Sequence, residues 1–466
     1  MNHGNIQNAE QVLKISEKVG ASMTEVIMYS LHDTAVRFAR SLIEQSVELQ
    51  DQGAFIKIIS KDGRYAEASV KSRRMETFYK VIKDMVNRGQ RNKKVQFSPP
   101  SKTLPITGTY VKKTAELTTE EIIESANLAI QTAHSASKKI SKVAGTIVRR
   151  ISHLSLVNSL GLSLAHNYTG YSIICTPLAE DSGSLAVGFA SRSSRDSSEI
   201  DVESIANESA RDAVLSLHPK PISLGRFDTI FQSDAAGDIV GSFIQQGFSI
   251  IRDPDYIQIG SQYASEVFTV KDEPHNLETL MPMSFDSEGT PTTSLTLIEK
   301  GIAKEKCYDK KLSFDEKRPS TGHSPFPHDP TYSSKFFTGW VYYPINQIVE
   351  PGRTTLQDMV ESSKRAILVK RLMYAGLPMG LSAGVQEGDI MQAYTMGTWL
   401  IENGEIKHPL PSLRLSNSLK GMIKSIELIG DINTVKKLGC INSPWLYVKD
   451  VNFTEMASLA IHEGVW

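Results

Sequence analysis

Apolar residues in the first 90 positions switch between helical and strand spacing. Helical spacing predicts helices over 9–19 and 74–86. Between them lie three β-rich stretches, 25–30, 35–43 and 55–60. Asp62-Gly63 then separates two extended runs, and Asp-Gly is a strong hairpin signal. The pattern predicts an antiparallel meander next to helices.

A longer helical pattern, a helix or helix pair, covers 118–143. Thr118 and Glu121 have the spacing of a capping box, in which each side chain accepts from a free backbone N–H of the other residue. Strands resume at 146, with a turn at Val157–Gly161, and a further helix is expected over 201–217.

Two prolines in His218-Pro-Lys-Pro221 predict the end of this helix and a domain boundary. We therefore expect an N-terminal mixed α/β domain over 1–220 and a C-terminal β-rich domain over 221–466, an α+β fold overall. The second domain is predicted to contain these elements: a strand over 227–231, a helix over 235–248, a proline-rich loop over 307–335, a helix over 355–371 and a hairpin turn at 402–405.

Composition and charge narrow the function classes. Hydrophobic residues are 40% and charged residues 22%, which is typical of a folded globular chain. With 51 Lys plus Arg against 52 Asp plus Glu, the chain lacks the basic excess of most nucleic-acid binders. Three scattered cysteines, a polar N-terminus and no long apolar run predict a cytoplasmic protein.

Common catalytic motifs are missing from the sequence. There is no His-Glu-x-x-His helix, no P-loop and no Gly-x-Ser-x-Gly elbow. His323 and His328 lie five residues apart in the proline-rich loop, where two exposed loop histidines are a simpler interpretation than a metal pair.

The segment from Phe231 to Asp238 is the most informative one. It follows a predicted strand and begins a helix, so Asp234 and Asp238 are expected on one helix face. Such a pair can bind a hard cation or act as acid and base. It can also be a pair of acids near the helix start that complement the dipole, and spacing alone favours this reading.

Several longer segments carry a family resemblance. Asp234-Ala-Ala-Gly-Asp238 is followed by Gly260-Ser-Gln-Tyr-Ala-Ser265, Val270-Lys-Asp272, Ile348-Val-Glu-Pro-Gly352, Leu356-Gln-Asp-Met-Val360 and Gly397-Thr-Trp-Leu-Ile-Glu-Asn-Gly-Glu-Ile406. With weaker pieces at 53–70 and 157–161, the chain resembles the TldD/PmbA family, and it is most similar to the PmbA branch, also called TldE.

The resemblance implies a zinc site that this chain has lost. Active members carry His-Glu-x-x-x-His on a helix and a cysteine near the C-terminus. Here the first His falls on Ser233, the Glu on Asp234 and the second His on Asp238, and Cys440 is the match for the cysteine. Zinc in such sites prefers nitrogen and sulfur ligands. We therefore expect no catalytic residues, no metal and no cofactor in this chain.

The implied function is a non-catalytic subunit of a heterodimeric peptidase for small or unfolded peptides, with zinc in a TldD-like partner. Two alternatives stay open: an independent metal-dependent hydrolase using Asp234, Asp238 and Cys440, and a non-enzymatic binding protein, which the family's historical label as a gyrase modulator suggests. A homodimer also stays open, and so does a lid role for the loop at 319–330. Membrane binding and direct nucleic-acid contact are not expected.

Overall fold

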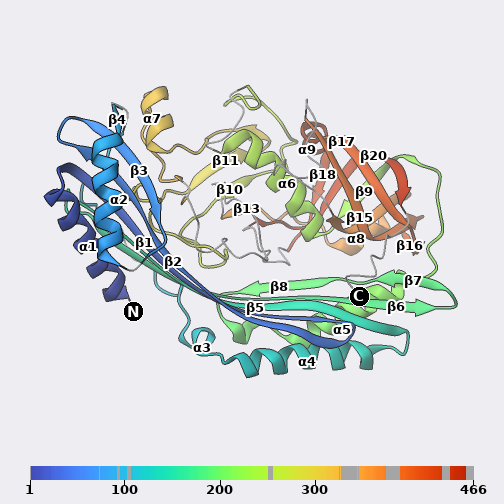
Figure 1. Ribbon diagram of the computed structural model, residues 1–466. Coiled ribbons are helices and arrows are strands. Elements are labelled where there is room, and N and C mark those ends of the chain that lie inside the picture. The colour runs from blue at the N-terminus through green and yellow to red at the C-terminus, as the bar shows by residue number, and fades with distance from the viewer. Residues whose placement is uncertain are drawn as a thin grey trace.

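The computed structural model describes residues 2–72, 74–91, 95–101, 106–249, 255–324, 326, 344, 346–373, 389–432 and 441–457. Its N-terminal part (2–217) is built on one large sheet, and its C-terminal part (225–457) on two smaller ones (Figure 1). The described chain is therefore a mixed α and β structure with a strand-rich second part, which confirms the predicted fold class.

The large sheet is antiparallel, with the order β4-β3-β2-β1-β5-β6-β7 and β8 beside β6. Its strands are β1 (Ala21–Ala39), β2 (Leu42–Ser60), β3 (Arg64–Val70), β4 (Gln90–Arg91), β5 (Ile140–Asn158), β6 (Ser163–Asp181), β7 (Ser184–Val187) and β8 (Ala190–Ser194). The N-terminal helices are α1 (Asn2–Lys18), α2 (Met75–Arg88), α3 (Lys112–Ala115), α4 (Thr119–Ala136), η1 (Ser197–Glu199) and α5 (Val202–Leu215).

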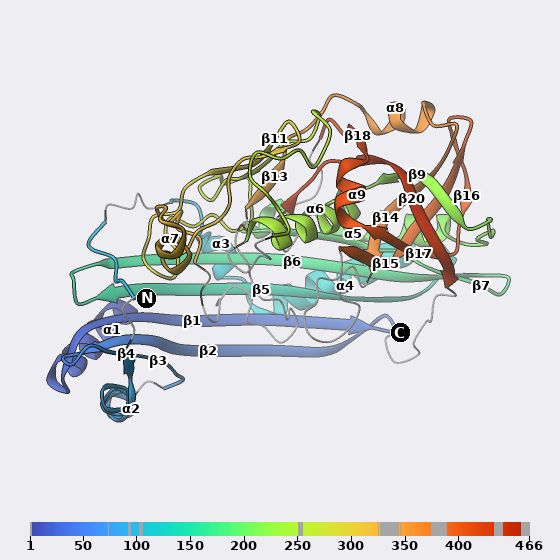
Figure 2. The same cartoon turned by 90° about the horizontal axis from the view of Figure 1, so that it is seen from above.

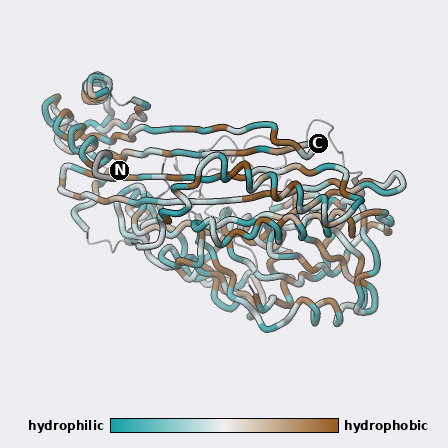
Figure 3. The backbone as a smooth tube through the Cα atoms, turned by 90° about the horizontal axis from the view of Figure 1, so that it is seen from below, coloured by the Kyte–Doolittle hydropathy of each residue, from teal (hydrophilic) through white to brown (hydrophobic). Residues whose placement is uncertain are grey.

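Strand alternation assigns the two faces of this sheet to different neighbours. On β1, Val26 and Val36 face the helices: α1 and α2 cover one end of this face, and α4 and α5 cover the other. Ile27 and Tyr29 face the opposite side and pack with Met283 of the C-terminal part. The alternation of apolar and polar positions can be followed along the long strands in Figure 3.

The C-terminal part contains a closed ring of strands. β9, β20, β17, β15 and β14 pair in that order, and β14 pairs with β9 to close the ring. β16 extends the sheet from β15, and β18 pairs with β20. The bounds are β9 (Gly225–Phe231), β14 (Arg365–Met373), β15 (Ile390–Glu402), β16 (Glu405–Pro409), β17 (Ser412–Ser418), β18 (Ile426–Ile429) and β20 (Leu446–Ala457).

A second small sheet has the order β12-β11-β10-β13-β19. Its strands are β10 (Val270–Asp272), β11 (Leu295–Glu299), β12 (Ile302–Ala303), β13 (Gln347–Val349) and β19 (Ile441–Asn442). The helices of this part are α6 (Ser233–Phe248), α7 (Lys310–Glu316), α8 (Leu356–Glu361) and α9 (Leu419–Lys424). Helix α6 is buried on nearly all sides and contributes to the largest hydrophobic core.

Several local predictions are confirmed. Thr118 and Glu121 form the capping box at the start of α4. Helices α2, α5 and α6 and the turns at 157–161 and 402–405 are also found where the sequence places them.

Other local predictions are wrong. The stretches 25–30 and 35–43 are not separate strands, because β1 runs through both and ends at Ala39. The helix predicted over 118–143 ends at Ala136, and β5 begins at Ile140. The helix predicted over 355–371 is only α8, because from Arg365 the chain pairs with β9 and β15 as β14. The loop predicted over 307–335 contains α7, and most of 325–343 lies outside the described residues.

No helix within the described ranges combines the length and the apolar character that a membrane span requires.

Candidate functional site

The predicted motif positions lie at the start of α6, directly after β9. Gln232 is the extended residue before the helix, and its N–H donates to the carbonyl of Val369 on β14 (2.9 Å). Ser233 and Asp234 are buried in the first turn, and Asp238 is half-buried one turn later. The four-residue spacing places Asp234 and Asp238 on one face, as the sequence predicts.

A cavity of about 810 Å³ opens at this first turn. It lies where the C-terminal ring meets β8 and α5 of the N-terminal part. Its described lining combines apolar and aromatic residues (Phe189, Ala190, Leu215, Leu356, Leu368, Trp399, Ile406, Pro409 and Trp445) with polar and charged ones (Ser191, Arg192, Asn207, Glu208, Arg211, Asp212, Gln232, Ser233, Asp234, Lys370, Lys407 and His408). A cavity of this size and mixed lining can hold a short peptide segment.

Arg371 on β14 supplies a positive charge beside the α6 carboxylates. Burial lowers the pKa of this guanidinium, and the negative charges of Asp234 and Asp238 act in the opposite direction. The guanidinium carbon lies 3.5 Å from the centroid of the Phe189 ring. Because arginine stays protonated in proteins, the two carboxylates face a permanent cation of their own chain.

Lys370, the residue before Arg371, joins the two parts of the chain next to the cavity. Its ammonium contacts Glu208 (2.8 Å) and Asp212 of α5, and Arg192 of β8 also contacts Glu208 (2.8 Å). Burial raises the pKa of Asp212. For Glu208 burial acts in the same direction, but Lys370 and Arg192 outweigh it and lower the pKa. These ion pairs hold α5 against β14.

The residues at the start of α6 do not fit a catalytic zinc ion. Ser233 offers a neutral hydroxyl, while Asp234 and Asp238 offer carboxylates, and none of the three is an imidazole or a thiolate. The nearby charge of Arg371 opposes a second cation at the same carboxylates. Among the residues that the structure describes, no group of three His, Cys, Asp or Glu side chains has the arrangement of a metal site. Cys440, the predicted fourth motif position, lies outside the described residues.

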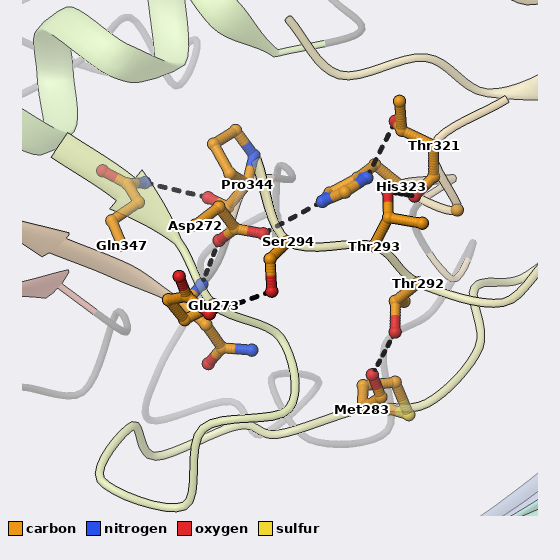
Figure 4. A network of polar contacts seen from close by, with 12 residues as sticks. Asp272, Glu273, Met283, Thr292, Thr293, Ser294, Thr321, His323, Pro344 and Gln347 are labelled. Carbon is orange, nitrogen blue, oxygen red and sulfur yellow. Dashed lines mark hydrogen bonds and ion pairs between the residues drawn. The ribbon is translucent and has the colours of Figure 1, made fainter. Parts of the chain in front are cut away.

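His323 is not the exposed loop histidine that the sequence suggested. Its side chain is fully buried, with Nε2 2.9 Å from Oδ2 of Asp272 and Nδ1 2.9 Å from the hydroxyl of Thr321 (Figure 4). The N–H of Asn346 donates to Oδ1 of Asp272 (2.8 Å). Both His323 and Asp272 are buried, and the network they form fixes the loop 320–324 against β10. His328 lies outside the described residues.

Sequence reasoning missed Arg371, Phe189 and Lys370. The short apolar run Ala366-Ile-Leu-Val369, with two β-branched residues, was the available signal for a buried strand. A strand would have placed Lys370 and Arg371 on opposite faces. Nothing local in the sequence links either residue to α5 or α6.

The fold and this site define a two-part α/β protein in which helix α6 begins at a cavity between the parts. The model for the PmbA/TldA metallopeptidase central domain matches residues 112–217, and the model for the C-terminal domain of the same metallopeptidases matches 224–455. The chain belongs to the PmbA/TldD family of metallopeptidase-related proteins.

Relatives and solved structures agree with this assignment. The metalloprotease PmbA of Escherichia coli O157:H7 is 26% identical over 335 residues, 70% of this chain and 68% of that protein. A Thermotoga maritima structure described as a candidate modulator of a DNA gyrase has a TM-score of 0.83 at 19% identity, covering 96% of this chain and 99% of the other. TldE from Thermococcus kodakarensis has a TM-score of 0.81 at 19% identity, covering 96% and 100%. The two structures show the shared fold.

Proposed function

We propose that this chain is a non-catalytic subunit of a heterodimeric TldD/TldE-type metallopeptidase that processes small or unfolded peptides, with the zinc ion in a TldD-like partner. One observation carries the proposal. Helix α6 begins with Ser233, Asp234 and, one turn later, Asp238, at the positions where the family resemblance implies two histidines and a glutamate, and Arg371 provides a positive charge next to the carboxylates.

The cavity at this helix supports a role with peptides. Trp399 and Trp445 provide apolar surface, while Arg192 and Lys407 provide donors for carboxylate and carbonyl oxygens. In the proposed complex this chain contributes to peptide binding and to enclosure of the site, and the partner's zinc supplies hydrolysis.

The test is native mass spectrometry of the tagged chain purified from its own organism. We expect a one-to-one complex with a different, related chain, carrying one zinc ion per pair that remains with the partner after dissociation. A chain that binds no related protein and carries its own zinc would overturn the proposal.

Activity assays distinguish the two alternatives. An independent hydrolase would cleave peptides as an isolated chain and would lose that activity in Asp234→Asn. A binding protein without a peptidase partner would be recovered with a protein that is not a metallopeptidase. The proposal predicts neither result: the isolated chain should be inactive, and Asp234→Asn should change nothing in that assay.

A further inference from the structure

A second cavity lies at α7, away from the start of α6. It has a volume of about 700 Å³ and is formed by residues of the segment 96–101, the turn 289–291 and the segment 310–320, which contains α7. Figure 2 shows α7 near one end of the long strands and β16, which lines the α6 cavity, near the other end. The two cavities are therefore separate. We call the second one the α7 pocket.

The lining of the α7 pocket is positively charged. Lys310, Lys317 and Arg318 contribute to it, and none of the described residues that line it is Asp or Glu. The acidic residues Asp315 and Glu316 of α7 are not part of this lining. Lys317 and Arg318 are exposed, and neither forms an ion pair within the described part of the chain. Cations that line a pocket without a carboxylate among them attract an anion.

Lys310 is the most buried of the three cations, and its contacts leave its charge in place. Its ammonium donates to the hydroxyl of Ser98 (2.6 Å) and to the backbone carbonyls of Glu288 (3.0 Å) and Gln96 (3.2 Å), which are all uncharged acceptors. Burial lowers the pKa of Lys310, and Glu25 and two further acidic side chains act in the opposite direction without outweighing it. A bound anion would stabilise the charged form of this ammonium.

Two hydroxyl groups and one aromatic ring of the pocket are also available to a ligand. Oγ of Ser101 and Oγ1 of Thr290 are buried and have no hydrogen-bond partner in the described structure. A hydroxyl can donate to an anion after rotation of its side chain. Phe314 lines the same pocket with its side chain 49% exposed, and its ring offers a flat apolar surface.

We propose that the α7 pocket binds a small phosphate monoester that carries an aromatic ring, the chemistry of a nucleoside monophosphate. A phosphate monoester has a charge of about −1.5 to −2 at pH 7 and three acceptor oxygens. Three cations and two unpaired hydroxyls match this group better than they match a single carboxylate. The base stacks on the ring of Phe314. A pocket of this volume is large enough for such a ligand.

Isothermal titration calorimetry of the purified chain with adenosine monophosphate (AMP) tests the proposal. Adenosine lacks the phosphate and ribose 5-phosphate lacks the base, so each should bind at least about tenfold more weakly than AMP. Phe314→Ala should bind AMP no better than ribose 5-phosphate, because the stacking surface is gone. A wild-type chain that binds no AMP, or that binds AMP and ribose 5-phosphate equally well, overturns the proposal.

A charge-removing variant locates the phosphate. Lys317→Asn/Arg318→Gln removes two exposed cations and should weaken AMP binding at least about a hundredfold. Asparagine suits position 317, where φ is 52° and the backbone is left-handed. The matched control, Lys364→Ser/Lys424→Ser, removes two exposed lysines that do not line the pocket and should bind AMP as the wild type does. Equal AMP affinity in the two double variants overturns the proposal.

Hydrogen exchange separates this inference from the proposed function. AMP should slow the exchange of backbone amides in 96–101 and 310–320 and leave the first turn of α6 unchanged. Protection at α6 alone would show that AMP enters the other cavity, and would overturn the assignment to the α7 pocket. A chain that binds its own zinc but takes AMP at α7 would overturn the proposed function alone.

Discussion

Two regions of the C-terminal part bury carboxylates, and they compensate the charge in different ways. Asp272 accepts bonds from the N–H of Asn346 and the ring of His323 inside a closed network that no solvent reaches. Asp234 lines a cavity, and both Asp234 and Asp238 interact with the positive charge of Arg371. The presence of a histidine is therefore a poor guide to the site here. The network around His323 fixes a loop against β10, whereas the cavity at α6 opens beside Asp234.

The largest effect is expected at the closed network. Asp272→Ala removes the carboxylate that Nε2 of His323 and the N–H of Asn346 contact in a fully buried place. We expect a loss of about 4 kcal/mol in the free energy of unfolding, measured by urea denaturation. Asp272→Asn keeps one acceptor oxygen and should lose less. Equal stability of Asp272→Ala and the wild type would contradict the structural role.

The carboxyl of Glu288 extends the comparison, because it takes up a proton and so carries no charge below its raised pKa. Burial, helped by the negative charge of Asp286, raises the pKa of Glu288 to about 7. This carboxyl lies where the turn 284–290 meets the large sheet. Four other ionisable groups also interact electrostatically with this turn: Lys57, Tyr65, Asp309 and Lys310.

The raised pKa predicts a specific pH dependence. Between about pH 4.5 and 7 the folded state holds a proton that the unfolded state has released, so stability falls as pH rises through this range. The loss attributable to Glu288 is about 3 kcal/mol. Glu288→Gln should remove this fall in urea denaturation at a series of pH values, while Glu180→Gln, at an exposed carboxyl of β6, should keep it. The same fall in both variants would contradict the assignment.

A smaller effect is expected at the α6 site. Arg371→Met removes the charge next to Asp234 and Asp238 together with the contact to the Phe189 ring. We expect a loss of about 2 kcal/mol in the free energy of unfolding, and about half of that for Arg371→Lys, which keeps the charge but not the planar contact. If Arg371→Met is as stable as the wild type, the guanidinium does not compensate these carboxylates.

Local signals in the sequence predicted much of the fold and only part of the site. Thr118 with Glu121 gave the start of α4 because a capping box depends on neighbours in the sequence. The helix predicted from 355 does begin there as α8, with a capping box between Thr355 and Asp358, but the chain then pairs with β9 and β15, so the helix ends early. Sheet pairing is set by distant segments, and local spacing does not report it.

Pairing with a distant segment also explains why the sequence predicted two strands where the structure has the single strand β1. Polar residues stand at 32–34, between the predicted stretches 25–30 and 35–43. In the structure Asp33 pairs with Arg150 on β5 through two bonds of 2.8 and 2.6 Å, so the strand continues through the polar positions. Arg371 was missed for the same reason, because its partners on α6 and at Phe189 are far away in the sequence.

The most direct test of the central claim is the zinc content of the chain produced alone. The metal-depleted protein is equilibrated with zinc, desalted and analysed by inductively coupled plasma mass spectrometry. The account predicts far less than one zinc ion per chain, with no difference between the wild type and Asp234→Asn/Asp238→Asn. One zinc ion per wild-type chain that is lost in the double variant would show that the α6 carboxylates hold a metal, and would contradict the account.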